Sequence, residues 1–413
     1  MPLNAGIVEP AGSETDRPET AATSVKTDDF PPSGADPRLE LPPFPRPWRH
    51  PLRSLLWGIR TAFGLLSLWL LLAVAAALPL VNFAALGWLL DAEGRVARSG
   101  RLREGLPLLP VAPRFGSIVL GVWLWLLPLR FASSAAVDAE LVSPGGMEAA
   151  RLAMLTRVLW AIITVHLCLA LARGGSLASF FRPIHNVRWL WRRLRDGNYW
   201  SDAGRAVRGF VSQLAPGRAA WRGVRGFAVA FVWLAVPTAL YAALRELEPG
   251  QGLITILGGV LLVWALAWVP FLQARFTATE QWSSGFEFRA TRELARHAPF
   301  AWTFALIGVY VLSLPLYLTK VVLPPADAMW LLTLVFIASI LPARVLTGWA
   351  YHRAVDRQRR GLRSRWPARL LARLLLLPLL STYVFVLFFT QYISEHGKRA
   401  LFEHHALLLP WPG

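Results

Sequence analysis

The hydrophobic residues of this chain gather in long runs, and the segments between the runs are rich in arginine. A transmembrane helix needs about 20 apolar residues to cross the ~30 Å hydrocarbon core of a bilayer. The runs long enough for this are Thr61 to Leu90, Ser117 to Val137, Leu152 to Ala172, Phe227 to Leu244, Leu253 to Gln273, Phe300 to Thr319, Met329 to Thr347 and Leu374 to Ile393. The pattern predicts an all-α polytopic transmembrane helix bundle with eight full spans.

The first run, Thr61 to Leu90, is too long for one crossing because a helix of that length would extend for ~45 Å. Pro79 marks the expected break, since proline cannot continue the backbone hydrogen bonds of a helix. A full span before Pro79 would be followed by a shorter helix, Leu80 to Leu90, that leads back toward Asp91 and Glu93. Whether this return helix crosses fully or is re-entrant stays open at this point.

The connecting segments alternate in charge. Residues 46–60, 91–116, 173–226, 274–299 and 348–373 carry 32 arginines, whereas residues 138–151, 245–252, 320–328 and 394–413 carry five basic residues and eight acids. Short loops rich in arginine stay in the cytoplasm. The sequence therefore predicts a multi-pass protein of the cytoplasmic (inner) membrane of a bacterium, with the N-terminus in the cytoplasm and the C-terminus outside.

Composition divides the chain further. Residues 1–45 carry eight acids among frequent proline, glycine, serine and threonine, and are expected to be disordered. The remaining parts are the first span with the Pro79 break, return helix and basic segment (46–116), a helical hairpin (117–172), a basic amphipathic segment (173–226), a second hairpin (227–273), an interfacial helix (274–299), a third hairpin (300–347), a basic segment (348–373), the last span (374–393) and an outer tail (394–413).

The segment from Arg173 to Arg225 carries eleven arginines. In its first half the apolar residues recur every three or four positions on one helix face: Phe180, Ile184, Val187, Trp191 and Leu194. After the turn signal Gly197-Asn198, a second helix repeats the arrangement with Trp200, Ala203, Val207, Phe210, Val211 and Leu214. Arginines occupy the opposite face of both helices.

Two interpretations fit these faces. Helices on the membrane surface would place tryptophans in the interface and arginines toward anionic head groups, whereas a soluble helical hairpin would pack its apolar faces together. The first interpretation is favoured and predicts lipid- or partner-binding residues: Arg188, Trp191, Arg192, Arg195, Trp200, Arg205 and Arg208. The net charge of +18 could also indicate nucleic acid, but no nucleic-acid-binding motif accompanies it. The expected partners are membrane lipids with anionic head groups, a protein or a second copy of the chain.

Few polar side chains fall within the spans, and none of the 25 acids lies in the middle of one, which argues against proton coupling. Asn82, Arg130 and His166 are the candidates for an intramembrane polar site. His166 could relay a proton or contact a solute, or only hydrogen-bond a neighbouring helix. Arg344, near the end of its run, is expected to extend to the interface.

No enzyme motif is present: the chain lacks a phosphate-binding glycine loop and a nucleophile elbow. The single cysteine, Cys168, excludes an intrachain disulfide and a cysteine-based metal cluster. Glutamates and histidines in the outer tail could ligate a metal, but they lack the spacing of a known metal motif. The sequence thus predicts no enzyme activity, no cofactor and no metal.

One stretch resembles a known family. The residues Leu78-Pro79-Leu80-Val81-Asn82-Phe83, Leu86-Gly87-Trp88-Leu89-Leu90 and Gly100 to Pro107 are similar to the entry segment of a domain-of-unknown-function family of bacterial multi-pass membrane proteins. Trp88 stands where that family tends to have tyrosine, and Leu108-Leu109 stand where acids often follow. The resemblance covers about 30 residues and implies a fold type without catalytic residues.

These observations predict a non-catalytic membrane protein whose basic cytoplasmic face binds anionic lipid or a protein partner. The alternative is a small-solute permease or channel, in which Pro128, Pro237 and Pro315 would break helices around a midplane site. A polar cavity containing Arg130 or His166 would favour the alternative. A lipid-modifying enzyme would need clustered acids and histidines at one interface, which the sequence does not offer.

Overall fold

The computed structural model describes residues 48–243, 249–321, 330–393, 397–404 and 407–408. All regular elements within these ranges are helices, and none is a strand. Eight helical segments of the described residues are long and apolar enough to cross a membrane: Pro51–Ala77 (α1), Ala112–Val142 (α3), Met147–Ala172 (α4), the segment of Tyr199–Leu214 (α7) and Pro216–Tyr241 (α8), Pro249–Thr279 (α9), Pro299–Val321 (α11), Trp330–Arg359 (α12) and Trp366–Ile393 (α13). The predicted all-α polytopic bundle is confirmed.

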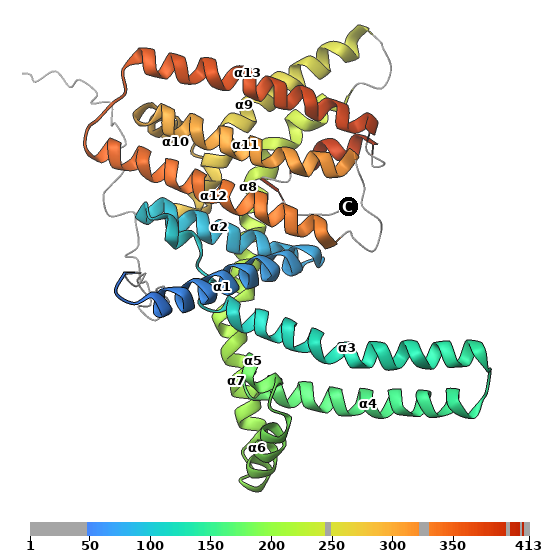
Figure 1. Cartoon of the computed structure of the whole chain (residues 1–413). Helices are drawn as coiled ribbons and strands as arrows, with labels where there is room; N and C mark the ends of the chain where they lie inside the picture. Colours follow the sequence, from blue (N-terminus) through green and yellow to red (C-terminus); the bar gives the residue numbers. More distant parts are fainter. Residues whose placement is uncertain (1–47, 244–248, 322–329, 394–396, 405–406, 409–413) are drawn as a thin grey trace, which may run out of the picture.

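The long helices run back and forth between two ends of the bundle (Figure 1). Helices α1, α3, α8, α11 and α13 start at one end, and α2 (Val81–Ser99), α4, α9 and α12 return to it. We name this the basic end, because its connecting segments are the arginine-rich ones. It also carries η2 (Leu102–Gly105), η3 (Trp282–Phe286) and α10 (Phe288–His297).

A sharp turn at Leu78-Pro79-Leu80 reverses the chain between α1 and α2. Leu80 adopts φ 66°, a left-handed backbone conformation that is strained for a residue other than glycine. The return helix is longer than predicted: it spans 19 residues, or about 28 Å, and carries Asp91 and Glu93 within it. It runs antiparallel to α1 back to the basic end (Figure 1).

Helix α2 lies at the centre of the bundle, packed against α1, α8, α9 and α12. Most of its residues are buried, although it is too polar to count among the apolar candidate spans of the described residues. Glycines bring the backbones together. A Cβ atom on Gly87 would lie 1.8 Å from the carbonyl oxygen of Ala219, and one on Gly223 would lie 1.9 Å from that of Phe83. The α2–α8 crossing therefore requires glycine on both helices.

Prolines lie inside most of the long helices without interrupting them. They are Pro128 in α3, Pro237 in α8, Pro270 in α9, Pro315 in α11, Pro342 in α12 and Pro378 in α13. The expectation that Pro128, Pro237 and Pro315 break their helices is therefore wrong. Each costs one backbone hydrogen bond, which a packed helix tolerates.

Helices α3 and α4 form a hairpin that projects from the rest of the bundle (Figure 1). In the apolar 18-residue stretch of each helix, only 17% of the residues are buried, the lowest share among the candidate spans. The buried residues gather toward the basic end, where Gly116 of α3 lies against Ser67 of α1. The outer part of the hairpin thus presents its apolar surface to its surroundings.

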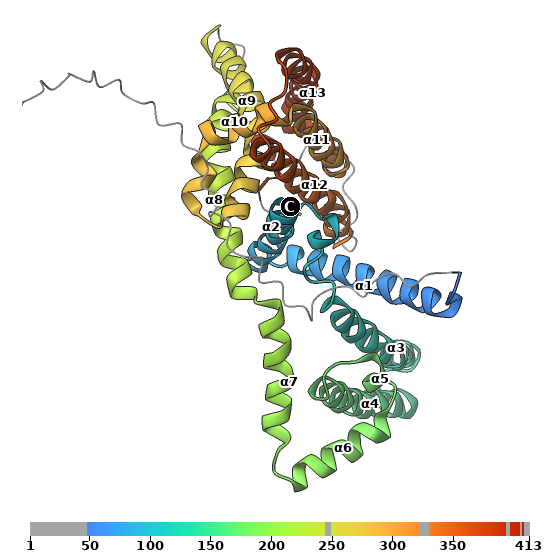
Figure 2. The same ribbon diagram turned by 90° about the vertical axis from the view of Figure 1, so that its left-hand side faces the viewer.

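The basic segment folds into α5 (Leu177–Phe180), α6 (Pro183–Arg195) and α7, which join the end of α4 to the start of α8 (Figure 2). Helix α6 begins at Pro183, not at Phe180, because proline disfavours helical backbone in the residue before it. Phe180 is completely buried, with its ring against Gly121 of α3. It therefore does not belong to the apolar face predicted for this helix.

After α13 the chain turns back into the bundle. The helix η5 (Gly397–Phe402) packs on α13, and Ala400, Leu401 and Leu407 are almost completely buried. The described residues of the predicted outer tail thus lie against the transmembrane helices.

Candidate functional site

Three polar side chains meet in the interior of the bundle. Glu93 of α2, Gln273 of α9 and Arg344 of α12 are exposed over only 0%, 0% and 3% of their surfaces. Arg344 Nη1 lies 3.1 Å from Glu93 Oε2 and donates a 2.8 Å hydrogen bond to Gln273 Oε1. The three helices are far apart in the sequence, so only the folded chain brings these groups together.

A backbone carbonyl of the C-terminal segment completes this interior cluster. Gln273 Nε2 donates hydrogen bonds of 2.9 Å to the carbonyl oxygens of Leu407 and of Gly226 in α8. Arg344 Nη2 donates a longer bond of 3.4 Å to the same Leu407 oxygen. The cluster therefore links α2, α8, α9, α12 and the C-terminal segment.

The ion pair of this cluster is costly to build. Removing an ion from water costs several kcal/mol, and the attraction within a buried pair offsets this only when further hydrogen bonds satisfy both groups. Gln273 and Leu407 supply such bonds to Arg344, whereas Glu93 Oε1 and Arg344 Nε have no partner in the described part of the chain. The cluster offers hydrogen-bond donors to a carbonyl oxygen.

The expectation that Arg344 extends to the interface is wrong. Helix α12 continues to Arg359, well beyond the apolar run that contains Arg344, so this residue lies near the middle of the helix and faces α2. One feature of the sequence indicates a buried pair: Arg344 is a charged residue within an apolar run, and a charge at membrane depth needs a partner of opposite charge. Its partner Glu93 follows the first apolar run, and nothing local indicates that the two meet.

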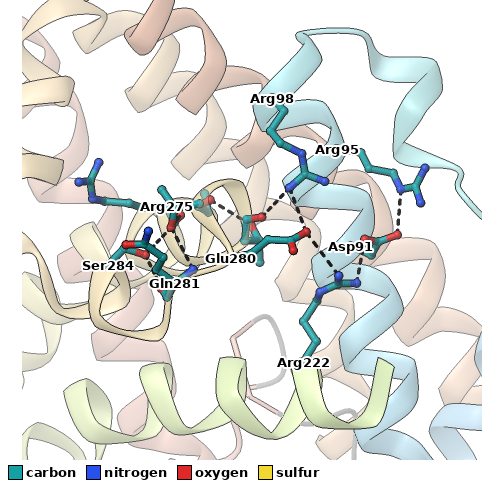
Figure 3. A network of polar contacts seen from close by, with 11 residues as sticks. Asp91, Arg95, Arg98, Arg222, Arg275, Glu280, Gln281 and Ser284 are labelled. Carbon is teal, nitrogen blue, oxygen red and sulfur yellow. Dashed lines mark hydrogen bonds and ion pairs between the residues drawn. The ribbon is translucent and has the colours of Figure 1, made fainter. Parts of the chain in front are cut away.

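A second polar network lies at the basic end, where α2, α8 and the end of α9 come together (Figure 3). Arg222 of α8 lies 2.8 Å from Asp91 and 3.6 Å from Glu280, while Arg95 lies 2.9 Å from Asp91. Arg98 lies 3.6 Å from Glu280 and donates a 2.8 Å hydrogen bond to the Thr277 carbonyl. The network fixes the three helices to one another, and its arginines are already paired.

All seven residues predicted to bind lipid or a partner lie on exposed surfaces of α6 and α7: Arg188, Trp191, Arg192, Arg195, Trp200, Arg205 and Arg208. The apolar faces of the two helices are exposed as well. Ile184, Trp191 and Trp200 are 71%, 67% and 81% exposed. A soluble hairpin packed on itself would bury these side chains, so the alternative interpretation of this segment does not fit.

The two helices are nevertheless anchored. Asn186 at the start of α6 is completely buried, donates a 2.8 Å hydrogen bond to the Ser179 carbonyl and accepts one from Arg173. Helix α7 is held by Arg114 of α3, which donates to the Ala206 carbonyl at 3.1 Å, and by Trp88 of α2, which donates to the Leu214 carbonyl at 2.9 Å. The arginine and tryptophan surface thus has a fixed position beside the α3–α4 hairpin.

Asn82, Arg130 and His166 do not form one site. Asn82 is buried at the start of α2, and Arg130 is exposed on α3. His166 is buried in α4, where its Nε2 lies 2.9 Å from the Phe180 carbonyl and its ring packs on Trp125. His166 therefore hydrogen-bonds a neighbouring element, which is one of the two roles that the sequence left open for it.

Other features of the described residues offer little chemistry. A groove of about 190 Å³ between α1 and α12 is lined by apolar side chains, including Leu65, Trp69, Ile337 and Leu341. No group of three potential metal ligands occurs in the described ranges. Of the possible ligands in the tail, Glu395, His396 and His405 lie outside those ranges, and His404 contacts Thr238.

Comparison with known proteins finds no relative: no protein-family model, no curated protein and no solved structure matches this chain. The resemblance to a family of unknown function around Leu78 to Pro107 therefore stays a prediction. The chain is an integral membrane protein by its eight apolar helices, and its activity has to be inferred from its own geometry.

Proposed function

We propose that this protein is a non-catalytic component of a bacterial cytoplasmic membrane whose basic segment binds anionic lipid head groups. The observation that carries the proposal is the exposure of residues on both faces of α6 and α7 in the described part of the chain: apolar side chains such as Ile184, Trp191 and Trp200 on one face, and arginines on the other. An amphipathic helix with tryptophans on one face and arginines on the other is typical of the membrane interface.

The position of the segment supports this proposal. Helices α6 and α7 cross the base of the α3–α4 hairpin, opposite its tip (Figures 1 and 2). A hairpin that crosses the bilayer would hold the two helices at the level of the head groups, with their apolar faces against acyl chains. The arginine distribution along the chain supports a cytoplasmic location of the same end.

The test uses the full-length protein reconstituted in lipid discs that contain equal amounts of a zwitterionic and an anionic lipid. Native mass spectrometry then reports the lipids that stay bound to the protein. The triple substitution Arg188→Gln, Arg192→Gln and Arg195→Gln is expected to reduce the retained anionic lipid at least about tenfold, because each arginine near a charged surface contributes about 1 kcal/mol. Raising the salt concentration should produce a similar loss.

The matched control removes three arginines that are also exposed, one just before α1 and two in its first part, in the variant Arg49→Gln, Arg53→Gln and Arg60→Gln. It lowers the net charge by the same amount but leaves α6 intact, so its loss of anionic lipid is expected to be much smaller. Equal losses in both triple variants would contradict a specific role of α6. A protein that accompanies the wild type and is lost only from the α6 variant, with lipid unchanged, would assign the surface to a protein partner instead.

A further inference from the structure

The C-terminal residues reach deep into the bundle. Lys398 donates a 2.9 Å hydrogen bond to the Ala242 carbonyl just after α8, and His404 lies 2.9 Å from the Thr238 hydroxyl. Leu407 then meets Gln273, which also bonds the Gly226 carbonyl. Ala242, Thr238 and Gly226 follow one another along α8 toward the basic end, so the segment descends beside this helix from the opposite end.

Non-helical backbone at membrane depth is stable only where protein or enclosed water satisfies its polar groups. Here the carbonyl of Leu407 receives donors from both Gln273 and Arg344. If the segment left, these donors would lose an acceptor in a medium of low dielectric constant, where an unpaired polar group is expensive. The interior cluster is therefore complementary to a carbonyl group carried by an apolar segment.

Leu401, Leu407 and Leu408 of this segment pack into the main hydrophobic core, but the helices around it also make contacts that do not involve it. Helix α2 packs directly on α8 at Gly87 and Gly223, and Arg344 connects α12 to α2 and α9 through side chains alone. The network of Figure 3 fixes the basic end separately. The C-terminal residues thus fill a space whose walls are held together by other interactions.

We propose that the bundle contains a peptide-binding site that takes an apolar segment and receives its backbone carbonyl on Gln273 and Arg344. In this structure the occupant is the chain's own C-terminus, Gly397 to His404 with Leu407 and Leu408, which we name the C-terminal plug. The plug is separable from the folded bundle. A peptide of the same sequence binds the vacated site when it is supplied from outside.

The test places one reporter thiol under the plug. Cys168 is replaced by serine, and Thr238, which is completely buried beside His404, is replaced by cysteine. In lipid discs, a water-soluble maleimide should label this cysteine slowly. Adding Leu401→Asp puts a charge at a completely buried plug position and should raise the labelling rate at least tenfold. The neighbouring substitution Phe402→Asp, at a position 38% exposed, is the matched control and should leave the rate unchanged.

A synthetic peptide of residues 397–413 should return the Leu401→Asp variant to slow labelling, and the same peptide with Leu401→Asp should not. Thermal unfolding of each variant is measured in parallel. The proposal is overturned if Leu401→Asp unfolds the bundle, because the plug is then an inseparable part of the core. It is equally overturned if labelling is slow in both variants, or if the wild-type peptide gives no protection.

Discussion

Arg344 and Glu93 are 251 positions apart in the chain, yet their side chains meet at 3.1 Å in the interior of the bundle. Gln273 and the Leu407 carbonyl surround the same guanidinium. This pair joins α2 to α12. It is also the point at which the helices contact the carbonyl group of Leu407 in the C-terminal plug.

Replacing Arg344 by methionine is expected to lower the free energy of unfolding by about 3–5 kcal/mol, because it leaves the Glu93 carboxylate buried without its partner. Unfolding in mixed detergent micelles measures this loss. Adding Glu93→Leu should restore much of the stability, since no buried charge then remains. Arg360→Met, which removes an exposed partner of Asp356, is the control and should change stability by less than about 1 kcal/mol. Equal effects of Arg344→Met and Arg360→Met would contradict the role of the interior pair.

Gly87→Ala is expected to destabilise the protein by about 1–3 kcal/mol or more, since its new methyl group would overlap the Ala219 carbonyl and force α8 away from α2. The same substitution at Gly209 of α7, where an added Cβ atom would have no atom within 4 Å, should be neutral or slightly stabilising. Thermal unfolding of the two single variants gives the comparison. If the Gly87→Ala protein has the same melting temperature as the wild type, the two helices are not in close contact.

Asn186→Leu is expected to release the start of α6, because it removes the hydrogen bonds of this side chain to Ser179 in α5 and to Arg173 at the end of α4. The loss of a buried hydrogen-bonding group, about 1–3 kcal/mol, should raise the rate of tryptic cleavage after Arg188 about tenfold or more. His185→Leu changes the exposed neighbour and should leave the rate as it is. Identical cleavage of both variants would mean that Asn186 does not anchor the helix.

Arg222→Gln is expected to weaken the network at the basic end, where Arg222 connects Asp91 and Glu280. The loss should be about 1 kcal/mol at low salt, since these side chains are partly exposed and Arg95 still pairs with Asp91. In ~1 M salt the difference from wild type should shrink, because screening then acts over about 3 Å. Arg218→Gln, on the exposed start of α8, provides the comparison. A salt-independent loss would assign Arg222 a packing role.

The fold could be predicted where the signal is local. Each apolar run contains its own evidence for a span, and the spacing of Ile184, Val187 and Trp191 defines a helix face without reference to the rest of the chain. The break at Pro79 is local as well. The predicted α2 was too short because the second half of this helix is polar. Its polar residues are stable in the interior because they pair with partners on α8, α9 and α12.

The interior cluster could not be predicted because each of its members has an ordinary local explanation. Arg344 near the end of an apolar run indicates a side chain that extends to the interface, and Glu93 after another run indicates a loop. Phe180 shows the same limit, since its spacing fits the face of α6 while Pro183 assigns it to a different element. Pairing across more than 200 residues depends on which helices become neighbours, and hydropathy carries no information on that.

The central place of α2 affects how the protein inserts into the membrane during its synthesis. Helix α2 leaves the ribosome directly after α1, but its partners α8, α9 and α12 are synthesised more than a hundred residues later. During that interval Glu93 and Asp91 have none of their arginine partners on the later helices. We therefore expect α2 to be unstable as a membrane-embedded helix until α8, α9 and α12 have been synthesised and can pack around it.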